Sequence, residues 1–123
     1  MAERKFAGVS GPVESAAVTA DYEAAAVYDK VRVGELGVYY RDGFKTRYIA
    51  FEEMDRAFIR VHGVRGRLCC GQAHYEYYRI VFVRGGKEIA DVISENEKAT
   101  DAALAQIAAH GVPTGFISDE AAG

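Results

Sequence analysis

Cysteine is nearly absent from the sequence: Cys69 and Cys70 are the two in 123 residues, and they are neighbours. Two cysteines cannot build the multi-bridge framework that holds small secreted domains together. A disulfide between adjacent residues would also close a strained ring, so we expect both thiols to be reduced.

Long apolar runs are missing as well. The first segment, MAERKFAGVSGPVESAA, has a basic pair but no apolar stretch of the length that a secretory signal requires. Charged residues make up 27% of the chain and interrupt its hydrophobic segments, which argues against a membrane span. We therefore expect a cytoplasmic protein without a transmembrane helix.

Motifs that specify a reaction are also missing. The glycine pair Gly85-Gly86 lacks the strand-to-helix context of a phosphate-binding loop and is typical of a hairpin turn. We expect no cofactor, and the pattern favours a non-catalytic protein over an enzyme.

Charge is present but unevenly distributed. Residues 1–29 carry two basic and five acidic groups, residues 30–87 carry twelve and six, and residues 88–123 carry one and seven, so the net charges are −3, +6 and −6. A basic middle between acidic ends can mark an anion-binding surface, or complementary faces that meet within the fold or between subunits. The overall pI near 5.6 does not favour nucleic-acid binding.

Helical spacing occurs twice. In TADYEAAAVYDKV, the apolar positions predict a short helix with Thr19 as its N-cap, although two strands of small residues are an alternative. In SENEKATDAALAQIAAHGVP, Ser94 and Glu97 have capping-box spacing, and Gly111 and Pro113 predict the end of a second helix.

Strand spacing dominates the middle of the chain. LGVYYRDGFKTRYIAF predicts a hairpin that turns at Asp42-Gly43, a further strand follows a tight turn at residues 52–55, and two more strands flank Gly85-Gly86. The resulting division is a lead-in over residues 1–18, mobile or paired at a sheet edge, one domain over residues 19–112, and a tail over residues 113–123. Strands followed by one terminal helix indicate an α+β fold, mainly antiparallel β, forming a small barrel or sandwich.

This order of strands, hairpins and capped C-terminal helix resembles the pleckstrin-homology-like superfamily, in particular its bacterial stand-alone members. The resemblance covers residues 33–110 and rests on pattern. It implies about seven strands in two near-orthogonal sheets, with the helix closing one end. It also implies a binding or scaffolding module for phosphoinositides, peptides or other proteins, without naming the ligand.

The segment VHGVRGRLCCGQAHYEYY, residues 61–78, holds the principal candidate surface. Arginine forks bind anions, and arginine and tyrosine are enriched at protein interfaces. We expect an anionic ligand or a protein to be bound by five residues: Arg60, Arg65, Arg67, Tyr75 and Tyr77. A second basic hairpin, with Arg41, Lys45 and Arg47, could form a phosphate cradle by analogy with the superfamily, if it is the first hairpin of the fold.

The alternative is a small enzyme or ligand-binding barrel whose site contains His62, His74 and Cys69. Nearby arginines would favour the thiolate, and the two histidines could meet at the mouth of one hairpin. Adjacent cysteines, however, diverge too far to wrap one tetrahedral ion easily, so no metal is expected.

The favoured hypothesis is a binding or assembly module that acts by surface recognition and forms a homo-oligomer. Large side chains on both faces of the strand at residues 77–83 support self-association. A phosphorylated or otherwise anionic ligand is a further candidate partner.

Overall fold

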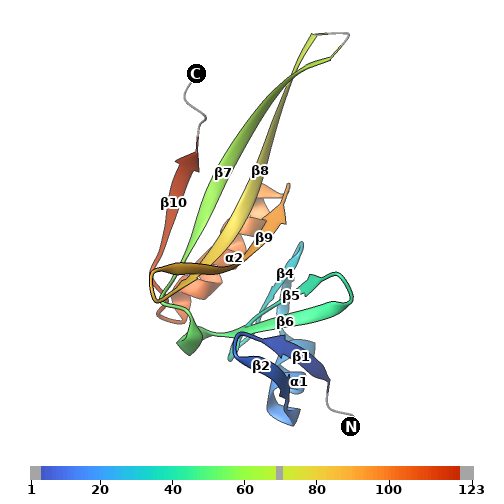
Figure 1. Ribbon diagram of the computed structural model, residues 1–123, viewed down its shortest axis with the longest axis vertical. Coiled ribbons are helices and arrows are strands. Elements are labelled where there is room, and N and C mark those ends of the chain that lie inside the picture. The colour runs from blue at the N-terminus through green and yellow to red at the C-terminus, as the bar shows by residue number, and fades with distance from the viewer. Residues whose placement is uncertain (1–3, 69–70, 120–123) are drawn as a thin grey trace.

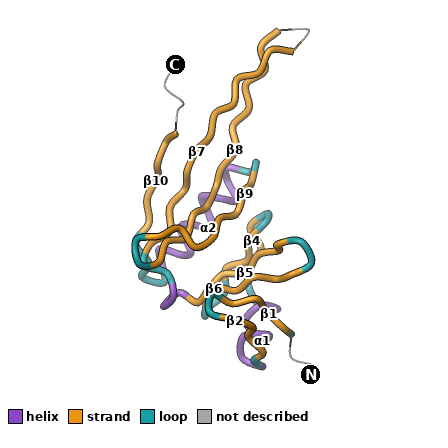
Figure 2. The backbone as a smooth tube through the Cα atoms, viewed as in Figure 1, coloured by secondary structure: helices purple, strands orange, loops and turns teal. Residues whose placement is uncertain are grey.

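The computed structural model describes residues 4–68 and 71–119, and the side chains of residues 4–61 and 77–115. Within these residues the fold is α+β, with ten strands, two α-helices and one short 3-10 helix, η1 (Phe51–Glu53) (Figure 1). The strands form two sheets, and one strand pair extends well beyond the rest of the molecule (Figure 2).

The first sheet has six strands in the order β2-β1-β6-β5-β4-β3. They are β1 (Lys5–Gly8), β2 (Gly11–Glu14), β3 (Ala26–Tyr28), β4 (Val31–Val33), β5 (Gly37–Asp42) and β6 (Lys45–Ala50). Neighbouring strands are antiparallel except β1 and β6, which are parallel and paired at Ala7 and Arg47.

The second sheet has four strands in the order β10-β7-β8-β9. They are β7 (Arg56–Leu68), β8 (Gly71–Arg84), β9 (Lys87–Ser94) and β10 (Thr114–Asp119). The first three are an antiparallel meander, and β10 adds to β7 in parallel.

The predicted hairpins are confirmed. Asp42 pairs with Lys45 across the β5–β6 turn, where Gly43 has a φ of 64°. Gly85 and Gly86 connect β8 to β9 with φ values of 61° and 77°. Glycine adopts this left-handed backbone without the steric cost that a side chain would add, so the two turns are fixed locally by the sequence.

The first helix lies earlier than the sequence pattern predicts. It is α1 (Ala16–Ala24), and the Ser15 hydroxyl, not Thr19, accepts a hydrogen bond from the first turn, at the Val18 amide. Residues beyond it form the short hairpin β3–β4, which turns at Asp29 with a φ of 55°. Valines in this segment satisfy helical and strand spacing alike, and pairing with β5 decides for the strand.

The N-cap of the second helix lies two residues later than expected, at Asn96 and not at Ser94. This helix is α2 (Glu97–Ala109), and the side-chain oxygen of Asn96 accepts from the Ala99 amide at 3.0 Å. The Ser94 hydroxyl instead accepts from the Asn96 amide and donates to Asp29, so the predicted capping box at Ser94 is wrong. Gly111, with a φ of 88°, ends the helix as predicted.

Both chain ends take part in the sheets. The expected lead-in contributes the edge hairpin β1–β2, and the segment expected to be a tail contains β10, which pairs with β7 from Ala57 to His62. The signal for β10 is long-range pairing, which local sequence patterns do not contain.

Most of the core lies between the two sheets and α2. Its buried side chains include Val38, Ile49, Ile59, Ile80, Phe82, Leu104 and Ile107. A separate cluster, formed by Phe6, Val18, Tyr39, Tyr48 and Ala50, packs α1 against the outer face of the first sheet.

Of the expected barrel or sandwich of about seven strands, the α+β class and the two sheets are confirmed, but the described strands do not form a closed barrel. The two sheets stay open, because in the part of the chain that the structure describes β9 pairs with β8 and with no strand of the first sheet. Neither helix among the described residues has the length and apolar character needed to cross a membrane.

Candidate interaction surface

A two-stranded ribbon is the most prominent feature of the molecule (Figure 1). Strands β7 and β8 pair without interruption from Arg56 and Val83 at the base to Leu68 and Gly71 near the tip. The neighbouring strands cover only the base, since β10 pairs with β7 as far as His62 and β9 pairs with β8 as far as Tyr78. Among the described strands, the backbone of residues 63–68 therefore pairs only with that of residues 71–76.

Three of the five residues expected on the contact surface lie on this ribbon beyond its base. Backbone pairing places Arg65 opposite His74, Arg67 opposite Gln72 and Tyr75 opposite Val64. Their side chains lie outside the described residues. The register places the three positions on one projecting element.

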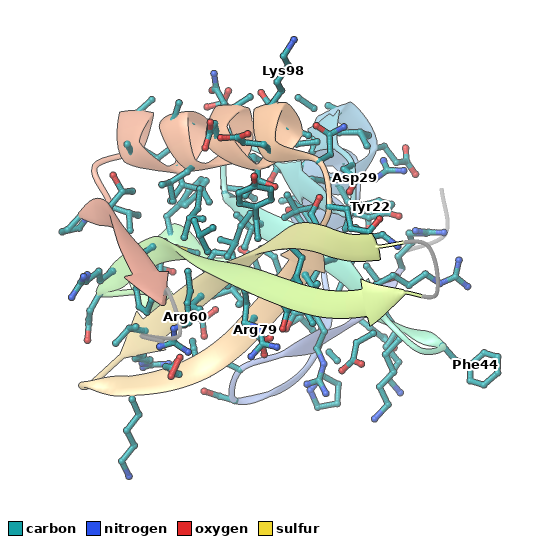
Figure 3. The ribbon with its side chains drawn as sticks, turned by 90° about the horizontal axis from the view of Figure 1, so that it is seen from above. Tyr22, Asp29, Phe44, Arg60, Arg79 and Lys98 are labelled. Atoms are coloured by element: carbon teal, nitrogen blue, oxygen red, sulfur yellow. The ribbon has the colours of Figure 1, made fainter. Side chains whose placement is uncertain are left out.

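Arg60 and Tyr77 lie at the base of the ribbon. Arg60 pairs with Arg79 across the strands, and both point away from α2 (Figure 3). Like charges on directly opposite strand positions repel each other. Here each arginine is compensated by an acid: Arg60 forms an ion pair with Glu88 at 3.2 Å, and Arg79 forms one with Asp91 at 3.1 Å. The charge of Arg60 is thus largely neutralised within the fold.

Phe58 lies beneath this charged layer and is buried. The guanidinium carbons of Arg56 and Arg60 are 5.0 Å and 5.5 Å from its ring centre, within the range of a cation–π contact. The arginines therefore shield an apolar strip on the face of the sheet away from α2. This role is structural.

The alternative site of His62, His74 and Cys69 is not assembled by the described backbone. Cys69 and Cys70 lie outside the described residues, as do the side chains of both histidines. Pairing places His62 opposite Tyr77 and His74 opposite Arg65, so the histidines are three residue steps apart, or about 10 Å. Both histidines lie within paired strands, His62 in β7 and His74 in β8, and not at the mouth of a hairpin as the hypothesis proposed.

No other metal site takes its place in the described part of the chain, where no three His, Cys, Asp or Glu side chains are grouped closely enough to hold an ion.

The second basic hairpin, β5–β6, is not the first of the fold, so the condition for the phosphate-cradle analogy is not met. Arg47 is paired with Asp42 at 3.1 Å, while Arg41 and Lys45 are exposed. Between them Phe44 is fully exposed at 102% and extends away from the body (Figure 3).

A hydrogen-bond cluster around Asp21 was not anticipated from the sequence. Its carboxylate accepts from the amides of Glu35 and Leu36 at 2.8 Å and 3.0 Å and from the Tyr39 hydroxyl at 2.6 Å. Burial raises the pKa of Tyr39, and the bond to Asp21 raises it further. A tyrosine held neutral in this way fastens α1 to the first sheet and is unsuited to act as a base.

Tyr22 extends this cluster. Its ring lies between two guanidinium groups, with the centroid 4.7 Å from Arg4 and 4.3 Å from Arg32. The Arg32 guanidinium also donates to the Tyr22 carbonyl at 3.2 Å. These contacts stabilise the packing of α1 on β4 and give the residues a role in the fold.

Comparison with known proteins gives no relatives: no protein-family model matches the chain, and neither does any curated protein or solved structure.

Proposed function

We propose that this chain is a non-catalytic binding and assembly module that self-associates through the β7–β8 ribbon. The observation that carries the proposal is the backbone pairing of residues 63–68 with residues 71–76 and, among the described strands, with no other strand. Each strand of the ribbon then presents one edge of backbone donors and acceptors that a further strand can satisfy.

Physical considerations favour a partner for the ribbon. An isolated two-stranded hairpin is marginally stable in water, and long uncovered strand edges promote pairing with other chains. The sequence over residues 62–76 adds Arg65, Arg67 and Tyr75, residue types that interfaces favour. A structure that maintains such a ribbon is therefore suited to assembly.

We also propose a pleckstrin-homology-like arrangement for the centre of the chain. Support comes from the strand order, since the meander β3-β4-β5-β6 is followed by the meander β7-β8-β9 and then by α2. The elements β1, β2, α1 and β10 would be additions to this plan. A module of this kind recognises partners through its surface.

Shortening the ribbon tests the proposal. Gly63 and Glu76 are cross-strand partners, so residues 64–75 can be replaced by Asn-Gly, a sequence suited to a two-residue hairpin turn. We expect the wild-type protein to show concentration-dependent dimerisation in sedimentation velocity, and the shortened variant to sediment as a monomer over the same range. Circular dichroism should show that both retain their helix and sheet content.

Phe44→Ser is the matched control, because it alters the tip of the other hairpin at a fully exposed side chain. We expect it to leave association unchanged. A wild-type protein that stays monomeric at high concentration, or a shortened variant that associates as strongly as wild type, would contradict the proposal.

A further inference from the structure

Three adjoining hollows, here together called the β9 groove, follow the outer edge of β9. Its central part, of about 720 Å³, is lined by β9 from Ile89 to Ile93 and, opposite, by Tyr40 and Arg47 of the first sheet. A second hollow, towards Gly8 and Val9, shares Ile89 and Tyr40 with it. A third, towards the start of α2, shares Ile93.

The lining shows that the groove meets β9 at its edge. Successive side chains of a strand point to opposite faces, yet five consecutive residues of β9 line the central hollow. Only the edge of a strand presents consecutive residues to one space. The groove is thus the open side of the sandwich, where a closed barrel would have joined β9 to the first sheet.

The edge is available for pairing. Among the described strands β9 pairs only with β8, from Tyr78 and Ser94 to Arg84 and Lys87, so its other edge faces the groove. Addition of an extended segment to such an edge is a common mode of recognition, because main-chain hydrogen bonds supply affinity. Ile93 is 47% exposed there, an apolar side chain that an added strand would cover.

We propose that this groove receives the β7–β8 ribbon of a second copy of the chain, one strand of which adds to β9 as a fifth strand of the second sheet. The inference rests on the proposed self-association and specifies its acceptor. Lengths agree, since the uncovered parts of the ribbon strands, residues 63–68 and 71–76, are similar in length to the eight residues of β9.

Charges agree as well. Residues 62–76 contain Arg65 and Arg67 against Glu76, a net charge of +1 with neutral histidines. The side chains that line the groove carry five acidic groups against four basic ones, a net charge of −1: Asp29, Asp42, Asp91, Glu95 and Glu97 against Lys30, Arg41, Arg47 and Lys98. Opposite net charges favour the encounter of ribbon and groove and disfavour pairing of two grooves with each other.

Hydrogen exchange measured by mass spectrometry tests the acceptor directly. Amides in residues 87–94 should exchange at least tenfold more slowly in the wild-type dimer than in the ribbon-shortened monomer. The amides of α2 should exchange equally in both, which controls for a general loosening of the fold.

A charged substitution at the groove gives a second test. Ile93→Lys adds a positive charge and a long side chain to the edge, and we expect the dissociation constant of the dimer to rise at least tenfold. Phe44→Lys makes the same kind of change, an apolar residue to lysine, at a fully exposed position outside the β9 groove, and should leave the constant unchanged.

The outcomes separate the two proposals. If the dimer needs the ribbon but residues 87–94 exchange alike in both proteins, the acceptor is wrong and self-association through the ribbon stands. If the dimer persists without the ribbon and β9 remains protected, another part of the second copy occupies the groove and both proposals fail. A monomeric wild-type protein overturns both.

Discussion

At the scale of single residues, Asp21 shows how one carboxylate joins distant segments. From the middle of α1 it accepts hydrogen bonds from two loop amides before β5 and from the Tyr39 hydroxyl within the sheet. The sequence places Asp21 near a predicted helix start, where an acid interacts with the helix dipole. Its observed position, five residues after Ala16, gives it a different role.

Asp21→Ala should lower the free energy of unfolding by about 3 kcal/mol, because two loop amides and a buried hydroxyl lose a charged acceptor. Urea denaturation followed by circular dichroism measures the change. Glu23→Ala, an exposed carboxylate on the same helix, is the control and should change stability by no more than about 0.5 kcal/mol. Equal effects of the two substitutions would contradict the role given to Asp21.

Three tyrosines make stability sensitive to alkaline pH. Burial raises the pKa of Tyr39, Tyr40 and Tyr48, with the bond to Asp21 contributing further at Tyr39. In the unfolded chain, tyrosine loses its proton at about pH 10, while in the folded protein these three tyrosines retain it. Increasing pH above that value therefore favours the unfolded state.

We expect the free energy of unfolding to be constant with respect to these groups below about pH 9 and to fall above pH 10, by up to about 1.4 kcal/mol per pH unit for each tyrosine. Urea titrations at pH 9, 10 and 11 measure the slope. Tyr39→Phe should reduce this slope by the contribution of one tyrosine. An unchanged slope would show that Tyr39 ionises at the same pH in the folded and the unfolded state.

At the scale of elements, the start of β5 depends on a close backbone approach. A Cβ atom at Gly37 would lie 2.8 Å from the Ala50 Cα and closer still to the Ile49 carbonyl oxygen, both in the main chain of β6. Main-chain atoms cannot move aside without breaking the hydrogen bonds between β5 and β6. A side chain at this position would therefore cause a steric clash that local rearrangement cannot remove.

Gly37→Ala should therefore lower the free energy of unfolding by about 2 to 3 kcal/mol in urea titration. Gly115→Ala in β10 is the matched control, since its Cβ would meet no heavy atom closer than 4.0 Å, at Arg56. A small effect at both glycines would show that β5 and β6 are farther apart than described.

The cap of α2 offers a similar test. Asn96→Ala should cost about 1 kcal/mol, because the Ala99 amide loses its acceptor. Glu95→Ala, one residue before the cap and exposed, should change the free energy of unfolding by no more than about 0.5 kcal/mol. Thermal unfolding of the two variants measures the difference, and equal effects would contradict the capping role of Asn96.

Elements with local signals were predictable, and those fixed by distant partners were not. Alternation and the glycine turns specified β5, β6, β8 and β9, and the Gly111 stop specified the end of α2. In contrast, β10 exists because it pairs with β7, which lies far earlier in the chain. The strand β3 was missed because its spacing fits a helix as well as a strand of the local hairpin β3–β4. For the candidate surface, composition identified residues 61–78, but the length of the ribbon follows from register, which no local pattern reveals.

At the scale of the whole molecule, the parallel strand β10 covers the edge of β7 from Ala57 to His62. Deleting residues 114–123 should lower the midpoint of thermal unfolding by several degrees and increase aggregation on heating, because six residues of pairing are lost and a buried strand gains a free edge. Differential scanning fluorimetry and light scattering measure the two effects. A truncated protein as stable and soluble as wild type would show that β10 contributes little to the second sheet.

The same strand sets the order in which the chain can complete its fold. Thr114 pairs with Ala57, so a growing chain must synthesise 57 further residues after Ala57 before the partner of that residue exists. Contacts this distant in sequence slow folding, because the intervening chain loses conformational entropy before the pairing can stabilise the structure. During synthesis, β7 therefore has an open edge until β10 emerges, and that interval is when chaperones or neighbouring nascent chains can capture it.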